Sequence, residues 1–138
     1  MIEKSLNACK GNHFETVTFI WMQGESDGAR GLGEVYEQSF LRLMARMKKD
    51  LAREDFNFVI GRISDARSDG ISAEGWRRVR QVQVKIAEDA QWGEWINTDD
   101  LNGPKDDLHY PAENQADLGR RFAEQAIKLI NRRNSDGS

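Results

Sequence analysis

The chain has 138 residues, of which 38% are hydrophobic and 31% charged, and its formal net charge is −3. This length suits one domain that buries a core without cross-links, and we expect it over residues 1–131 with a disordered tail over 132–138. Basic residues are dispersed among acids, which argues against nucleic-acid binding. No apolar run approaches the roughly 20 residues of a membrane span.

The start of the chain has no apolar stretch typical of a signal peptide, so the sequence as written predicts a cytoplasmic protein, although the compartment is not identified. Cys9 is the only cysteine, which excludes an intrachain disulfide and a cysteine-rich zinc site. We interpret Cys9 as a packing residue. The aspartates between residues 99 and 107 fit no calcium-loop spacing, so we expect a solvated acidic loop and no metal site there.

Predicted strands and helices alternate along the chain. In chain order they are one or two helical turns (2–9), a strand (16–22), a glycine-rich loop (24–33), a helix (34–53), a strand (56–63), a polar loop (64–71), a helix (73–90), a short strand (95–97), an acidic loop (98–110) and a helix (111–131). The first two strands are apolar runs typical of strands covered on both faces. This alternation predicts an α/β fold with a parallel sheet and right-handed crossovers.

Two polar clusters follow predicted strands. Gln23, Gly24 and Glu25 come directly after the first strand, and Asp106 stands three residues before His109 in the loop after the third. Because parallel strands end at one edge of a sheet, we expect both clusters to meet there. A carboxylate can orient a histidine as a general base, and an amide can donate to a developing oxyanion.

Each of these residues also has a simpler interpretation. His109 can be a helix-capping or surface histidine, Gln23 an amide that braces its loop, and Glu25 an exposed acid. The glycines of the 24–33 loop do not form a phosphate-binding loop, because no Gly-Lys-Ser/Thr follows them and their order differs from a dinucleotide fingerprint.

Four segments carry a family resemblance. Residues 21–27 (Trp-Met-Gln-Gly-Glu-Ser-Asp) resemble the W-x-Q-G-E-S-D block of SGNH-type carbohydrate acetylesterases, the group of sialate O-acetylesterases and acetylxylan esterases. Residues 79–83 resemble the V/L-R-x-x-Q stretch of a later helix, residues 106–109 resemble the D-x-L-H block, and residues 118–123 are similar to the helix after it. The resemblance covers essentially the whole chain in the right order.

The resemblance implies a three-layer flavodoxin-like fold with strand order 2-1-3-4-5, of which this chain matches strands three to five. We therefore expect a truncated sheet of about three strands with flanking helices. It also implies hydrolysis of acetyl esters on sugars without metal or organic cofactor. His109 would be the general base, Asp106 its orienter, and Gln23, with Gly24 and Glu25, part of the oxyanion hole or its frame.

The family's nucleophile is a serine in a G-Q-S-N-like loop after its first strand, and no such loop occurs in this sequence. Ser5 lacks the flanking glycine and strand, and Ser26 lies inside the Gln-Gly-Glu block. The nucleophile is therefore unassigned. Because the members of a catalytic triad act as a unit, we expect the chain by itself to have weak or no activity.

Three functions stay open. The first is deacetylation of a carbohydrate, which becomes efficient only if a partner supplies the serine. The second is a non-catalytic module, a degenerate or truncated esterase that binds a carbohydrate or dimerises. The third is hydrolysis by a water that His109 activates. Besides an acetylated carbohydrate, the expected partner is a second copy or a complementing chain that covers the exposed edge of the first strand.

Overall fold

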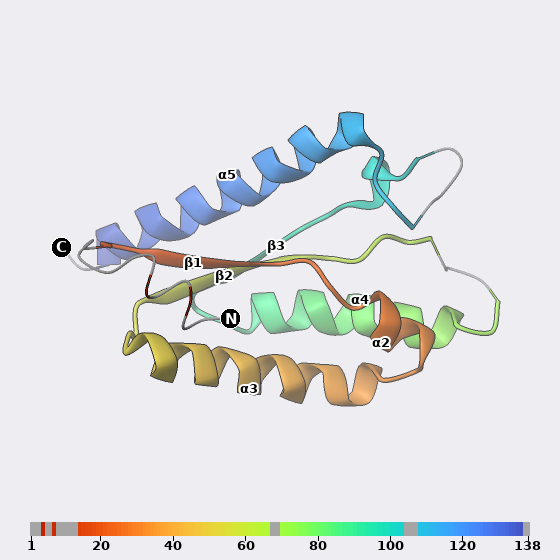
Figure 1. The fold of residues 1–138 in the computed structure, drawn as a ribbon, viewed down its shortest axis with the longest axis horizontal. Helices are drawn as coiled ribbons and strands as arrows, with labels where there is room; N and C mark the ends of the chain where they lie inside the picture. The colour runs from red at the N-terminus through yellow and green to blue at the C-terminus, as the bar shows by residue number, and fades with distance from the viewer. Residues whose placement is uncertain (1–3, 5–6, 8–13, 67–69, 104–107, 137–138) are drawn as a thin grey trace.

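A three-stranded parallel sheet lies at the centre of the computed structural model, which describes residues 4, 7, 14–66, 70–103 and 108–136 (Figure 1). The strands are β1 (Val17–Trp21), β2 (Phe56–Gly61) and β3 (Gly93–Ile96), in the spatial order β1-β2-β3. Both strand pairs run parallel. The predicted fold class, α/β with a parallel sheet of about three strands, is confirmed.

Helices cover both faces of the sheet and give three layers (Figure 1). One face carries α2 (Glu25–Ala29), α3 (Gly33–Leu51) and α4 (Ala73–Glu88), and α5 (Ala112–Asp136) crosses the other. A 3-10 turn, η1 (Asp99–Leu101), follows β3. In the described part of the chain no helix is both long and apolar enough to cross a membrane.

The core forms on both sides of β2, whose six residues are all buried. Successive side chains of a strand point to opposite faces. Phe56, Phe58 and Ile60 therefore pack toward α3 and α4, while Val59 packs with Phe122 of α5 and its neighbours. The apolar run that predicted a strand covered on both faces is thus the central strand.

Helix α2 lies where the sequence predicted a glycine-rich loop. Gly28 of α2 packs on Trp76 of α4, and a Cβ built on Gly28 would come within 3.0 Å of that indole. Gly75 of α4 faces Gly28 in return, because its own Cβ would overlap the Gly28 carbonyl oxygen. These glycines let the two backbones approach, so packing on α4 stabilises a helix too short to show helical periodicity.

The last helix is longer than predicted. It continues to Asp136, so the prediction of a disordered tail is wrong for residues 132–136. Arg133 donates a hydrogen bond to Asn57 Oδ1 (2.8 Å), and its guanidinium lies over the ring of Trp92 (4.2 Å to the centroid). These contacts hold the final turn against the sheet. The predicted turns at 2–9 lie outside the described residues, apart from Lys4 and Asn7.

Strand β1 is the least covered part of the sheet. Among the described residues it pairs only with β2, and α5 packs on β2 and β3. Val17, Phe19 and Trp21 pack into the core beside α3, whereas Ile20 points to the opposite face and is 44% exposed. The free edge predicted for the first strand is therefore present in the described structure.

Candidate functional site

Strand ends are fastened to one another at the carboxyl edge of the sheet. Arg62, which follows β2, donates its backbone N–H to Ile96 O at the end of β3 (3.1 Å). Thr98 Oγ1 then donates to Arg62 O (2.6 Å). The loops after β2 and β3 therefore start from fixed positions. They leave the carboxyl edge of the sheet, which is where ligands bind in parallel α/β proteins.

A single buried amide joins the ends of β1 and β2. Gln83 of α4 is fully buried, donates from Nε2 to Gln23 O (2.8 Å) and accepts at Oε1 from Ile63 N (2.9 Å). Both ends of this side chain are thus satisfied by backbone groups in the loops that follow β1 and β2. Because an unpaired buried polar group is costly, the amide fixes the distance between the two loops.

Tyr36 of α3 also binds the backbone of Gln23, at the turn after β1. Its hydroxyl donates to Gln23 O (2.8 Å) and accepts from Trp21 Nε1 (3.0 Å). Burial raises the pKa of Tyr36, so the hydroxyl stays protonated and able to donate over the neutral range. The backbone of Gln23 is therefore held by donors from α3 and α4.

The turn itself requires glycine at position 24. Gly24 has φ +144°, a region that side chains rarely adopt, and a Cβ there would lie 2.9 Å from both Gln83 Nε2 and Val79 Cγ1. The backbone of the Gln-Gly-Glu block thus packs closely against α4. Gly24 therefore fixes the course of the backbone at the end of β1.

The side chain of Gln23 has a defined partner. Its Nε2 donates to Asp27 Oδ2 (2.6 Å), which braces the loop at the start of α2. This contact corresponds to the simpler interpretation considered for Gln23, and it uses one of the two amide hydrogens. Glu25 is half-buried and begins α2.

His109 is exposed, and its neighbour Tyr110 is anchored at the carboxyl edge. Tyr110 donates its hydroxyl to Thr98 Oγ1 (2.7 Å), which extends the hydrogen-bond chain that begins at Arg62 O. Burial raises the pKa of Tyr110, and the negative charge of Glu25 raises it further. Asp106 lies outside the described residues.

Two arginines surround Asp99. Arg80 belongs to the V/L-R-x-x-Q segment noted in the sequence, but neither Arg80 nor Arg62 was predicted to contact the loop after the third strand. Arg80 binds both carboxylate oxygens (2.8 and 2.9 Å) and also donates to Ile63 O (2.5 Å). Arg62 donates from Nη2 to Asp99 Oδ2 (2.6 Å). One sequence feature could have indicated Arg80. It stands three residues before Gln83, and residues at this spacing lie on one side of a helix.

The negative charge of Asp100, the next residue of the acidic loop, is also balanced by an arginine. Arg121 of α5 binds Asp100 and Asp117, and the hydrogen bond from Arg121 lowers the pKa of Asp100 to about 2. Within the described ranges no three His, Cys, Asp or Glu side chains gather as a metal site would need. The first two aspartates of the loop are thus ion-paired with arginines, not simply solvated.

The described serines near the site differ in access. Ser64 follows β2 at the carboxyl edge, but it is 2% exposed, and its carbonyl accepts the Trp76 indole N–H (2.6 Å). Ser26 is exposed on α2, directly after Glu25. Neither serine is both accessible and placed at the end of a strand, so the described residues assign no nucleophile.

Comparison with known families gives a match over residues 1–128, to a family described as carbohydrate esterase, sialic acid-specific acetylesterase. No curated protein matches the chain. The matched residues include the three strands, Gln83 of α4 and His109. The chain belongs to this carbohydrate esterase family.

Proposed function

We propose that this domain hydrolyses acetyl esters on carbohydrates. Family membership supports this activity, and so does the hydrogen bond that anchors Tyr110, the residue after His109, to Thr98 at the carboxyl edge of the sheet. That edge is where parallel α/β proteins bind small ligands. Its backbone is held rigidly by Gln83 and Tyr36, as a preorganised site requires.

The proposed roles follow from the chemistry of each group. His109 acts as the general base that accepts a proton from the attacking hydroxyl, and Asp106 orients its ring. The amide of Gln23 contributes to the frame of the oxyanion hole through its remaining N–H, with Gly24 and Glu25 fixing the turn. A donor that acts on an oxyanion contributes roughly 3 kcal/mol to transition-state stabilisation.

The chain by itself should turn over esters weakly. A base without a nucleophile cannot form an acyl-enzyme. Of the two serines described near the site, Ser64 is buried and Ser26 lies on a helix. We therefore propose that efficient hydrolysis needs a serine from a partner chain.

Ester turnover and covalent labelling test this proposal together. We expect slow hydrolysis of a chromogenic acetyl ester that is lost in His109→Ala and kept in His13→Ala, the matched variant at the other histidine. A serine-directed fluorophosphonate should label no serine. Fast turnover with a labelled serine would contradict the expected weakness. Turnover that is lost in Asp106→Asn without a covalent intermediate would favour a water activated by His109.

A non-catalytic dimer is the second candidate, and the uncovered face of β1 favours it. Ile20 is 44% exposed there, and β1 has a free edge in the described structure. Unpaired strand edges invite a further strand, so a second copy would extend the sheet. Light scattering should then show a dimer at micromolar concentration that Ile20→Lys converts to monomer, while Ile127→Lys on α5 does not. A monomeric unmodified chain would rule this candidate out.

A further inference from the structure

His109 lies between two residues that are each anchored to the body of the domain. Leu108 before it packs against the core cluster beneath α3 and α4, and Tyr110 after it donates its hydroxyl to Thr98 Oγ1 (2.7 Å). His109 itself is exposed. Exposed loops move unless neighbouring contacts hold them, so the anchors on either side help to fix the backbone of His109.

The hydroxyl of Thr98 defines the direction of the second anchor. Thr98 is fully buried, and it donates its single O–H to Arg62 O (2.6 Å). A hydroxyl has one hydrogen and two acceptor lone pairs, so Thr98 Oγ1 accepts from Tyr110 and does not compete with it as a donor. Two hydrogen bonds in series thus connect the end of β2 to the residue after His109.

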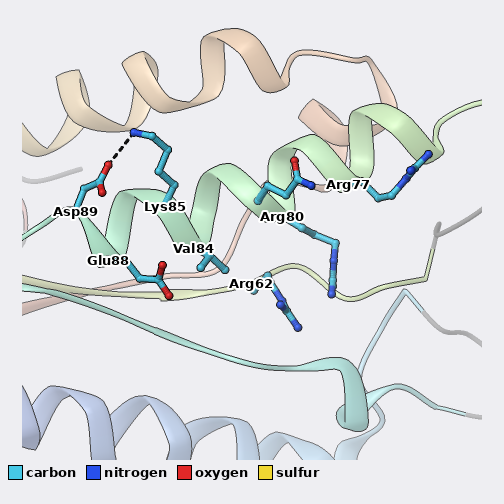
Figure 2. Close-up of a pocket in the computed structure, with 8 residues that line it drawn as sticks. Arg62, Arg77, Arg80, Val84, Lys85, Glu88 and Asp89 are labelled. Carbon is cyan, nitrogen blue, oxygen red and sulfur yellow. Dashed lines mark hydrogen bonds and ion pairs between the residues drawn. The ribbon is translucent and has the colours of Figure 1, made fainter.

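The residues on either side of this acceptor are bound by arginines. Arg62 and Arg80 lie next to each other, although they come from the residue after β2 and from α4 (Figure 2), and both bind Asp99. Arg121 of α5 donates to the carbonyl oxygen of Asn97 (2.9 Å). These contacts come from both helical layers, so the acceptor has a fixed position relative to the sheet.

The start of α5 holds the same segment from the other direction. Gln115 donates from Nε2 to Tyr110 O (3.0 Å), and Asn114 donates from Nδ2 to Leu101 O at the end of η1 (2.9 Å). Both the side chain and the backbone carbonyl of Tyr110 are therefore bound. Neither bond from α5 involves the phenol, so Tyr110→Phe removes one anchor and leaves the others in place.

We propose that Tyr110 is a positioning residue for the general base: through Thr98, its hydroxyl fixes His109 at the carboxyl edge of the sheet. The inference rests on the proposed function, because His109 is the base of that reaction. It adds a residue to which the sequence assigned no role, since Tyr110 stands directly after the D-x-L-H block. A general base must lie within hydrogen-bond reach of the proton it removes, and small displacements slow the reaction strongly.

The NMR signals of the His109 imidazole test this role without requiring turnover. The chain has two histidines, so His13→Ala assigns the ring signals of His109. We expect Tyr110→Phe to shift these signals and to lower the backbone order parameters at Leu108 and His109. Tyr36→Phe is the matched control. It removes the hydroxyl of the chain's other tyrosine, which donates to Gln23 O, and it should leave the His109 signals unchanged.

Variants of Thr98 keep the test decisive if Tyr110→Phe alters the fold. Thr98→Ser retains the hydroxyl and should keep the His109 signals of the unmodified chain, whereas Thr98→Val removes the acceptor and should shift them. Because both changes break one bond, Tyr110→Phe and Thr98→Val together should shift the signals no further than either alone. Unchanged signals in Tyr110→Phe or in Thr98→Val, or equal shifts in Thr98→Ser and Thr98→Val, would overturn the inference.

Ester hydrolysis separates this inference from the proposed function. In a chain that turns over an acetyl ester, Tyr110→Phe should lower kcat about tenfold or more and leave KM within about twofold. A higher KM with an unchanged kcat would overturn the positioning role and leave the esterase activity standing. Shifted His109 signals in Tyr110→Phe, in a chain without turnover, would support the anchoring of His109 by Tyr110 and count against the esterase activity alone.

Discussion

At the residue scale, Gly24 combines a positive φ with close contacts between its backbone and α4. We predict that Gly24→Ala destabilises the fold by about 2–4 kcal/mol, because the backbone is strained at φ +144° and the new Cβ meets Gln83 and Val79. Urea denaturation measures the change in the free energy of unfolding. The same substitution should weaken the hydrogen bonds that Gln83 and Tyr36 donate to Gln23 O. Changes in the backbone NMR chemical shifts at the end of β1 would report this.

Gly31 provides the matched control for that substitution. It also has a positive φ, +70°, but a Cβ there would meet nothing within 4 Å. Gly31→Ala should therefore cost only about 1 kcal/mol, the strain of the left-handed conformation alone. Equal effects at the two positions would show that the close approach of α4 to residue 24 contributes nothing.

Gln83 should matter more than its neighbours on α4. Gln83→Met keeps the volume but removes the acceptor for Ile63 N, so one buried N–H loses its partner, at a cost of about 1–3 kcal/mol. Gln81→Met, two residues earlier and exposed, should change stability by less than about 0.5 kcal/mol. Thermal and urea unfolding of both variants measures the difference, and similar losses would contradict the bridging role of Gln83.

The sequence indicated which residues of the loop after β1 to consider as site residues, but it did not indicate their hydrogen-bond partners. Gln23, Gly24 and Glu25 stand out because an apolar strand ends in a polar block. The Arg62–Asp99 pair does not stand out, because its members are 37 residues apart and charged residues are usually solvated. The partner of the Gln23 amide, Asp27, depends on the course of α2, which periodicity did not reveal.

At the scale of elements, Arg121 of α5 joins this helix to the loop after β3 through Asp100, and it also pairs with Asp117 on its own helix. Its hydrogen bond lowers the pKa of Asp100 to about 2, below the unfolded value of about 3.9. A lowered folded pKa gives stability that is present above pH 4 and is lost as the pH falls through 2. We predict that Asp100→Asn reduces the loss of stability between pH 5 and pH 2.5, measured as the urea midpoint.

The Arg121→Gln background tests whether this effect belongs to the pair. Once Arg121 is absent, Asp100→Asn should change the urea midpoint little at either pH. An undiminished effect of Asp100→Asn in that background would mean that other groups cause the acid sensitivity.

The helices of this chain differ in how well their patterns predicted them. Helices α3 and α4 have long apolar stripes, and their predicted and observed limits agree within two residues. Helix α2 has five residues and forms because Gly28 and Gly75 allow it to pack on α4. The end of α5 was missed because residues 132–136 are polar, and Arg133 is held there by Trp92 and Asn57, which are distant in sequence.

At the scale of the whole molecule, the alternation of strands and helices determined the architecture. Each right-handed crossover that moves one strand further along the sheet places its helix on the same face, which explains why α3 and α4 lie together. Helix α5 packs on β2 and β3 and covers the opposite face. Alternation alone did not give the order of the strands or how far α5 reaches, because both depend on packing between residues distant in sequence.

The position of α5 over β2 and β3 implies a gradient of amide protection across the sheet. Water reaches the uncovered side of β1 near Ile20, whereas every residue of β2 is enclosed. In deuterium oxide, the β2 amides should exchange last, at a rate set by global unfolding, and outward-pointing β1 amides should exchange much earlier. Comparable rates in β1 and β2 would mean that another surface shields the outer strand in solution.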